Sequence, residues 1–172
     1  MCKKDIQTHV LYVMINPRQK VILIVTNIQF KTNSCDICCE LCHYSENSTT
    51  HRSTVTGEVF PITSPIVCTD TFLIYNIFCR KCMTEKPGDQ DHYTGKTKDS
   101  MASRASAHRS DTRTGKNKAV PEHFNGPGHS LADMLFLPIE KVPNGDETLL
   151  ASREEFWIRK KQSYEKGMNR QK

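Results

Sequence analysis

Residues 71–172 alternate between strand-type and helix-type patterns, and this alternation constrains the fold more than any other feature of the chain. Three segments rich in aliphatic and aromatic side chains are predicted strands: residues 71–78, a segment ending at Tyr93, and residues 135–139. Three segments are predicted helices: residues 101–114 with Asp99 or Ser100 as N-cap, residues 121–124, and residues 148–161. We therefore predict an α/β (α+β) unit with a small, three-stranded, mostly antiparallel sheet flanked by helices.

The first 70 residues differ in composition from this unit. Residues 1–33 have a strand-type pattern broken by Asn16-Pro17 and carry no motif, so we treat them as a leader of unknown structure. Residues 34–70 open with Cys35-x2-Cys38-Cys39-x2-Cys42 and continue through a polar stretch. The sequence thus predicts a leader at 1–33, a small Cys-rich module at 34–70, and the α/β domain at 71–172.

Charge and hydropathy limit the partners that this chain can have. A net charge of +5 at pH 7 is compatible with a polyanionic partner, although solvated helix faces also carry many basic residues. The longest purely aliphatic run, Val21–Val25, is too short to span a membrane, and no signal peptide follows Met1. We therefore expect no membrane partner and an intracellular location, where the eight cysteines are thiols or metal ligands rather than disulfides.

Arg104 and His108 are four residues apart in a predicted helix, so both side chains project from one face. The planar fork of an arginine pairs with two phosphate oxygens at once, which suits the hydrolysis of a phosphodiester. An ordinary basic helix surface is the alternative interpretation of this pair.

Glu154 and Glu155 are adjacent, but helical periodicity separates them. Glu154 shares a stripe with apolar Leu150, Trp157 and Ile158, whereas Glu155 falls on the polar side. A carboxylate on an apolar stripe is costly unless it is paired or binds a metal ion. Glu154 is therefore the better candidate for a metal ligand, with an ion pair at the edge of the core as the alternative.

Tyr75 and Tyr93 are expected on neighbouring strands, where a tyrosine is most often a core residue with a tethered hydroxyl. A phenol with an ordinary pKa of about 10 becomes a general base only beside a cation or a histidine.

In their order and spacing, these residues resemble the GIY-YIG nuclease domain, particularly the version carried by Penelope-like retroelements. The matching motifs are Leu73-Ile74-Tyr75, Tyr93-Thr94-Gly95, Arg104 with His108, Glu154, and Asn169. Features that point to the Penelope-like branch are Cys79-x2-Cys82 and the stretch from His123 to His129. Thr94 departs from the family pattern, which has an aliphatic residue there, and the segment between Cys82 and Tyr93 is longer and more polar.

The resemblance implies a divalent-metal-dependent DNA endonuclease, derived from a mobile element, that hydrolyses phosphodiester bonds without a small-molecule cofactor. Glu154 would hold Mg²⁺ (or Mn²⁺), and Arg104 would bind the scissile phosphate. Tyr75 or Tyr93, aided by His108, would help to activate water. The supporting residues would be Gly95, His123 and Asn169. A DNA substrate implies a nuclear location, and the sequence makes no prediction of oligomeric state.

Paired C-x2-C spacings favour a structural zinc ion, because two thiolates on a tight turn occupy two corners of a tetrahedron. We favour Cys39 and Cys42 together with two of Cys68, Cys79 and Cys82 as the Zn²⁺ ligands, with His43 as a further candidate. The alternative is free thiols without a metal ion.

Two functions of other classes stay open at this point. One is a catalytically inactive nucleic-acid-binding module that uses the same basic face. The other is a zinc-stabilised interaction protein, whose binding would depend little on salt, unlike phosphate contacts.

Overall fold

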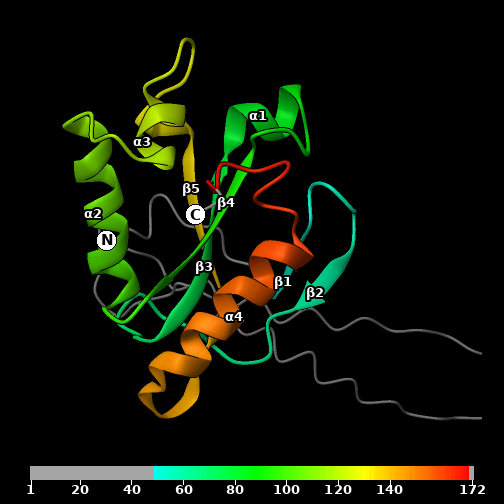
Figure 1. The fold of residues 1–172 in the computed structure, drawn as a ribbon, viewed down its shortest axis with the longest axis vertical. Coiled ribbons are helices and arrows are strands. Elements are labelled where there is room, and N and C mark those ends of the chain that lie inside the picture. The colour runs from blue at the N-terminus through cyan, green and yellow to red at the C-terminus, as the bar shows by residue number, and fades with distance from the viewer. Residues whose placement is uncertain (1–48, 171–172) are drawn as a thin grey trace, which may run out of the picture.

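The structure is a computed structural model that describes residues 49–170 (Figure 1). Its strands are β1 (Thr50–Arg52), β2 (Val59–Pro61), β3 (Leu73–Cys79), β4 (His92–Thr97) and β5 (Met134–Lys141). Its α-helices are α1 (Arg80–Glu85), α2 (Met101–Arg113), α3 (Ala119–Phe124) and α4 (Glu147–Lys160). Two short 3₁₀ turns, Leu131–Asp133 and Pro143–Gly145, flank β5. Among the described residues, no helix is both long enough and apolar enough to cross a membrane.

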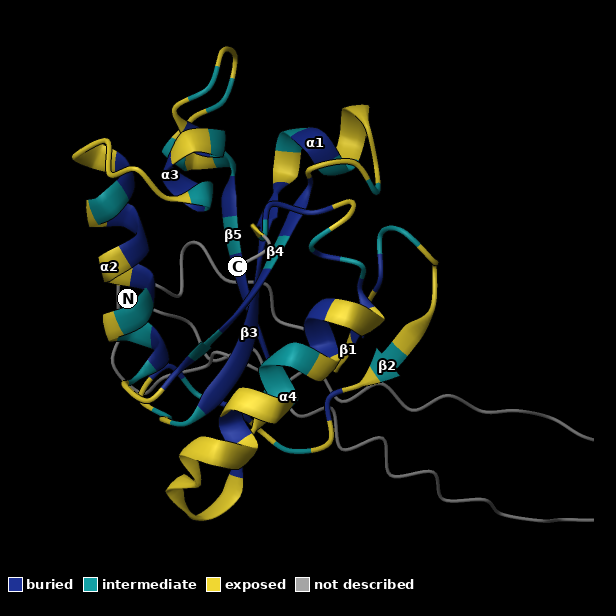
Figure 2. Ribbon diagram, viewed as in Figure 1, coloured by how far each residue is buried: buried dark blue, intermediate teal, exposed yellow. Residues whose placement is uncertain are grey.

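The main sheet has three strands in the order β4-β3-β5, and both pairs are antiparallel. All seven residues of the central strand β3 are buried, because the sheet is covered on both faces (Figure 2). Helix α4 lies across β3 and β4, and α2 packs beside α3 (Figure 1). The predicted fold class, a small antiparallel sheet flanked by helices, is confirmed.

Local capping sets where the two long helices begin. The Ser100 hydroxyl accepts a hydrogen bond from the Ser103 amide (3.1 Å), so α2 starts at Met101 as the sequence predicts. The Asp146 carboxylate accepts from the Leu149 amide (2.9 Å), which starts α4 one residue earlier than expected. These caps fix the direction in which each helix presents its side chains to the sheet.

The prediction that Tyr93 ends a strand is wrong. Strand β4 begins at His92 and continues to Thr97, with Tyr93 opposite Ile77 and Gly95 opposite Tyr75. Pairing with a fully buried neighbour therefore carries the strand through Gly95, despite the weak strand propensity of glycine. Helix α1, which directly follows β3, was not expected from the sequence.

A short hairpin of β1 and β2 packs on helix α4. The rings of His51 and Phe60 lie 4.8 and 5.2 Å from the ring of Trp157, and His51 is 2% exposed. This hairpin belongs to the predicted module at 34–70, whose boundaries stay a prediction. The predicted ligands Cys39 and Cys42, like the leader at 1–33, lie outside the described residues.

Candidate functional site

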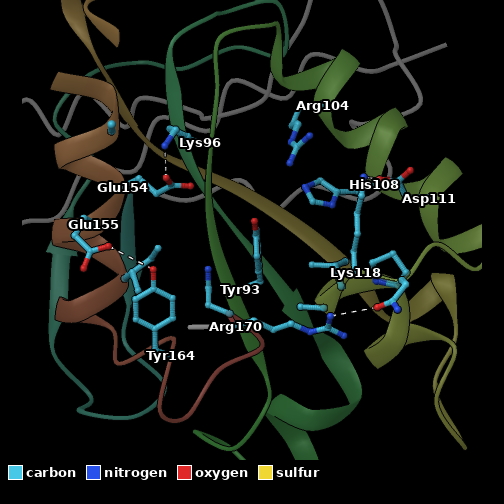
Figure 3. Close-up of a pocket in the computed structure, with 17 residues that line it drawn as sticks. Tyr93, Lys96, Arg104, His108, Asp111, Lys118, Glu154, Glu155, Tyr164 and Arg170 are labelled. Atoms are coloured by element: carbon cyan, nitrogen blue, oxygen red, sulfur yellow. Dashed lines mark hydrogen bonds and ion pairs between the residues drawn. The ribbon is translucent and has the colours of Figure 1, made fainter. Parts of the chain in front are cut away.

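A pocket of about 520 Å³ opens between α2, α4, strand β4 and the C-terminal segment (Figure 3). The predicted site residues that line it are Tyr93, Arg104, His108, Glu154 and Asn169. They come from separate elements far apart in the sequence, and the fold brings them to one concave surface. Lys96, Asp111, Lys118, Glu155, Tyr164 and Arg170 add charged and polar groups to its walls.

Tyr75 lies beneath this pocket and links Arg104 to His108. Its hydroxyl is 2.8 Å from Arg104 Nε and 2.7 Å from His108 Nε2. Arg104 Nε can only donate, so the Tyr75 hydroxyl accepts a hydrogen bond from it and donates its own to Nε2 of the neutral His108 ring. Arg104 and His108, which lie on one face of α2, therefore both hydrogen-bond to the same hydroxyl on β3.

This arrangement fixes the protonation of the buried groups. Burial, with a contribution from the Arg104 charge, lowers the pKa of His108 to about 3, so the ring is neutral at pH 7 and accepts at Nε2. Burial also raises the pKa of Tyr75 above its usual range. Tyr75 is fully buried and stays protonated, which suits a positioning residue rather than a general base.

Of the two predicted tyrosines, Tyr93 is the one that lines the pocket. It is partly exposed, and its ring lies 6.5 Å from that of Tyr75 and 5.8 Å from that of His108. Burial raises the pKa of Tyr93, while the Arg104 guanidinium acts in the opposite direction. Of the two tyrosines, Tyr93 is the one that can contact a water molecule in the pocket.

Gly95 makes room for both tyrosines. A Cβ atom at this position would lie 2.8 Å from the Tyr75 hydroxyl oxygen and 2.6 Å from a ring carbon of Tyr93. Since both contacts are with ring systems held in the sheet, a larger residue would displace one of the tyrosines. Gly95 is therefore required by packing.

Glu154 faces the pocket from α4 and pairs with Lys96 on β4, with Lys96 Nζ 2.5 Å from a carboxylate oxygen (Figure 3). The ion pair uses one of the two carboxylate oxygens. Mg²⁺ is commonly held by one or two carboxylates together with substrate phosphates, so this donor fits the ion predicted for it. The neighbouring Glu155 pairs instead with Arg159 (2.7 Å) and approaches the Tyr164 hydroxyl (3.4 Å).

Asn169 ties the C-terminal segment to β4. Its amide accepts from the Thr94 backbone N–H (2.9 Å) and donates to the Thr94 carbonyl (2.8 Å). The Thr94 hydroxyl contacts the Asn76 amide (2.8 Å) and the Ser163 hydroxyl (2.9 Å). The polar residue that departs from the family pattern is thus satisfied by a buried network, and Asn169 holds the strand that carries Tyr93.

A second cluster consists of Cys79, Cys82, His123 and His129, whose ligand atoms all lie within 4.8 Å of one another. Cys79 Sγ is 3.5 Å from His129 Nδ1, and Cys82 Sγ is 3.6 Å from His123 Nε2. Ligand atoms of a tetrahedral zinc ion are about 3.4–3.8 Å apart, given zinc bonds of about 2.1–2.3 Å. The four side chains therefore fit a structural zinc ion.

Among the described residues, this cluster differs from the predicted set of zinc ligands. Cys79 and Cys82 are members, but the other two members are His123, predicted only as a supporting residue, and His129, which was not predicted as a ligand. Cys68 is buried beside the start of α2, where its carbonyl accepts from the Ala102 amide, and is not a member. Strand β3 and helix α1 carry the cysteines, whereas the histidines lie in α3 and the loop after it.

Sequence reasoning missed Lys96 and His129 as site residues. Lys96 directly follows Gly95, and strand alternation places it on the same face as Thr94, so its approach to Glu154 depends on where α4 crosses the sheet. His129 had a usable signal, because the spacing His123-x5-His129 is close to the histidine spacing of zinc sites.

No protein-family model matches this chain, and no curated protein matches it. Among solved structures, the catalytic domain of the homing endonuclease I-TevI is similar, with 25% sequence identity and a TM-score of 0.46. The match covers 58% of this chain and 97% of that domain.

Proposed function

We propose that the protein is a divalent-metal-dependent endonuclease that hydrolyses phosphodiester bonds in DNA. One observation carries this proposal: Tyr93, Arg104, His108 and Glu154 meet in one pocket although they lie on three different elements. A basic helix surface without a function would have no reason to orient Arg104 through a buried tyrosine. The resemblance of the motifs to the Penelope-like GIY-YIG domain supports the same reaction, a mobile-element origin and a nuclear location.

The chain supplies positioning and charge for this reaction. Arg104 donates through Nε to the Tyr75 hydroxyl and also contacts the Tyr93 side chain, so its guanidinium is held at the pocket wall, where it can pair with the non-bridging oxygens of a phosphate. The Tyr93 hydroxyl accepts a hydrogen bond from the attacking water and orients it toward phosphorus. A Mg²⁺ or Mn²⁺ ion held by Glu154 would supply positive charge beside the scissile phosphate. Lys96, once released from Glu154, adds a cation to the same region.

The Cys79–Cys82–His123–His129 cluster has a structural role in this proposal. A bound zinc ion would connect the end of β3 to the end of α3 and the loop after it, where the two cysteines are buried and the two histidines are partly exposed. Helix α3 lines the pocket through Ala119, Val120 and Pro121, so fixing its C-terminal end keeps one wall of the pocket in place.

Nicking of a supercoiled plasmid in Mg²⁺ or Mn²⁺ tests the proposal. Glu154→Gln and Arg104→Ala are each expected to lower the nicking rate by about 100-fold or more, as expected when a charge aimed at the transition state is lost. The matched controls are Glu147→Gln, an exposed glutamate on the same helix, and Arg52→Ala, an exposed arginine on the hairpin. Neither control residue lines the pocket.

The outcome separates the proposed reaction from its alternatives. Nicking by wild type and by both controls, with loss in the two pocket variants, supports the roles of Glu154 and Arg104. Wild-type protein that binds DNA at low salt but nicks none contradicts the endonuclease and favours the inactive binding module. Binding that is insensitive to salt favours an interaction protein.

A further inference from the structure

A second pocket of about 450 Å³ continues from the first one. The two pockets share four lining residues: Ala119, Tyr164, Asn169 and Arg170. Beyond them the second pocket is lined by the backbone and side chains of Gln90, Glu122, His123, Gly167 and Met168. The two pockets are therefore adjacent: the first holds the proposed reaction centre, and the second has no assigned role.

Arg170 lies where the two pockets meet. Figure 3 places Tyr93 between Arg170 and Arg104, so the two arginines flank the proposed reaction centre. The guanidinium of Arg170 pairs with the Glu122 carboxylate and donates to the Asn117 side chain (3.3 Å). Both partners of the ion pair are about half exposed, with side-chain exposures of 49% and 53%. Exposed pairs contribute little to stability, so a phosphate can displace Glu122 at low cost.

Tyr164 supplies an aromatic surface at the same junction. It lines both pockets, and its hydroxyl makes only a long contact of 3.4 Å to Glu155. Nucleic-acid bases stack on such aromatic rings without regard to sequence. An arginine beside a partly exposed aromatic ring can hold one nucleotide, by its phosphate and by its base.

Gln90 forms the far wall in an uncommon backbone conformation. Its φ is +52°, in the left-handed region, and its backbone N–H donates to the Lys166 carbonyl at 2.6 Å. Residues other than glycine hold this conformation only where neighbouring structure imposes it, and such positions cluster at binding sites. Gln90 is exposed, and its side-chain amide can both donate a hydrogen bond to the edge of a base and accept one from it.

We propose that this second pocket binds the nucleotide adjacent to the scissile phosphate. Arg170 contacts the phosphate of that nucleotide, and the Tyr164 ring stacks on its base. The inference rests on the proposed function for its placement next to a scissile bond, but the pocket itself is defined by different residues. Substrate is thereby held on both sides of Tyr93, by Arg104 and by Arg170.

The test measures binding and nicking in parallel. The dissociation constant Kd is measured for a fluorescent duplex of about 20 base pairs and for its separate strands. These measurements use the Glu154→Gln background, so that no strand is cut. Nicking KM and kcat are measured in Mg²⁺ without that change. The variants are Arg170→Ala, Arg170→Lys, Tyr164→Ala and Tyr164→Phe, and Arg52→Ala is the charge-matched control.

Arg170→Ala is expected to raise Kd and KM by about 10-fold with kcat within about two-fold of wild type, and to reduce the salt dependence by about one phosphate contact. Arg170→Lys retains that salt dependence. Tyr164→Ala weakens binding by about 10-fold, whereas Tyr164→Phe keeps the ring and binds as wild type does. Arg52→Ala leaves all of these values unchanged.

Other outcomes overturn the inference in distinguishable ways. If wild type nicks DNA but Arg170→Ala and Tyr164→Ala bind as wild type does, the subsite is wrong and the endonuclease stands. If Arg52→Ala weakens binding as much as Arg170→Ala, only general charge is involved and the subsite is again wrong. If wild type binds but does not nick, and the two variants weaken binding, the endonuclease is wrong and a nucleotide site stands. If wild type neither nicks nor binds, both proposals are wrong.

Discussion

Replacing Tyr75 by phenylalanine tests the hydrogen-bonded link beneath the proposed reaction centre. The change removes one buried hydroxyl and leaves the aromatic ring, so no cavity forms. Its consequence follows from the two groups that the hydroxyl contacts, Arg104 Nε at 2.8 Å and His108 Nε2 at 2.7 Å.

The two lost hydrogen bonds cost different free energies because His108 is more deeply buried than Arg104. His108 is 6% exposed, so its Nε2 is left without a donor, which costs about 1–3 kcal/mol. Arg104 is half-buried and can turn its Nε toward water, so its share is about 1 kcal/mol or less. We expect Tyr75→Phe to lower the free energy of unfolding by about 1–4 kcal/mol.

Urea denaturation at pH 7 measures this change, with an unaltered m-value as the sign that only stability has moved. Tyr93→Phe is the matched control, since its hydroxyl lies at the pocket surface and should cost less than about 1 kcal/mol. In the nicking assay, Tyr75→Phe should lower kcat by about 10-fold and leave KM close to wild type, because Arg104 loses its orientation.

Equal small losses in Tyr75→Phe and Tyr93→Phe would refute the link. So would a Tyr75→Phe protein that is destabilised as expected but nicks with an unchanged kcat, since Arg104 would then be oriented by other groups.

Three further perturbations test the buried groups. Cys82→Ser should abolish the binding of about one zinc ion per chain, measured by metal analysis of the purified protein, whereas Cys68→Ser should retain it. Lys161→Met should raise the free energy of unfolding at pH 7 by about 1–2 kcal/mol, because Lys161 is 1% exposed and burial lowers its pKa to about 8. That gain should shrink between pH 8 and 10.5, where the folded protein has released the proton that the unfolded chain still binds. Burial lowers the pKa values of His51 and His108 from 6.5 to about 3, so the unfolded chain binds more protons in this range. The free energy of unfolding, measured by urea denaturation, should therefore fall as pH drops from 6.5 toward 3, by up to about 1.4 kcal/mol per pH unit for each histidine. A free energy that does not change with pH in this range would contradict the assignment of both rings as neutral.

Short-range physics made part of the site predictable. The pairing of Arg104 with His108 follows from the helical repeat, and the start of α2 follows from the capping hydroxyl of Ser100. Glu154 was distinguished from Glu155 by the same periodicity, and the two do have different partners, Lys96 and Arg159. Each of these inferences depends only on residues within about two helical turns.

The zinc cluster shows where such reasoning stops. Its cysteines and its histidines are 41 to 50 residues apart in the contacts that join them, so no local pattern states that they meet. The predicted combination of Cys79 or Cys82 with the upstream Cys39 and Cys42 was based only on the C-x2-C spacing in the sequence. The cysteines meet the histidines because the fold places the end of β3 and the start of α1 next to α3 and the loop that follows it.

The sequence by itself determined the type of the three main strands and of helices α2, α3 and α4, and the faces of the two long helices. Tertiary structure decided that Tyr93 opens to the pocket while Tyr75 is buried, because the crossing of α2 over the sheet covers one tyrosine and leaves the other at an edge. It also decided that Lys96 meets Glu154 and that Arg170 lies between two pockets. These arrangements depend on packing between distant segments, where the free energy of burial, rather than local preference, selects the neighbours.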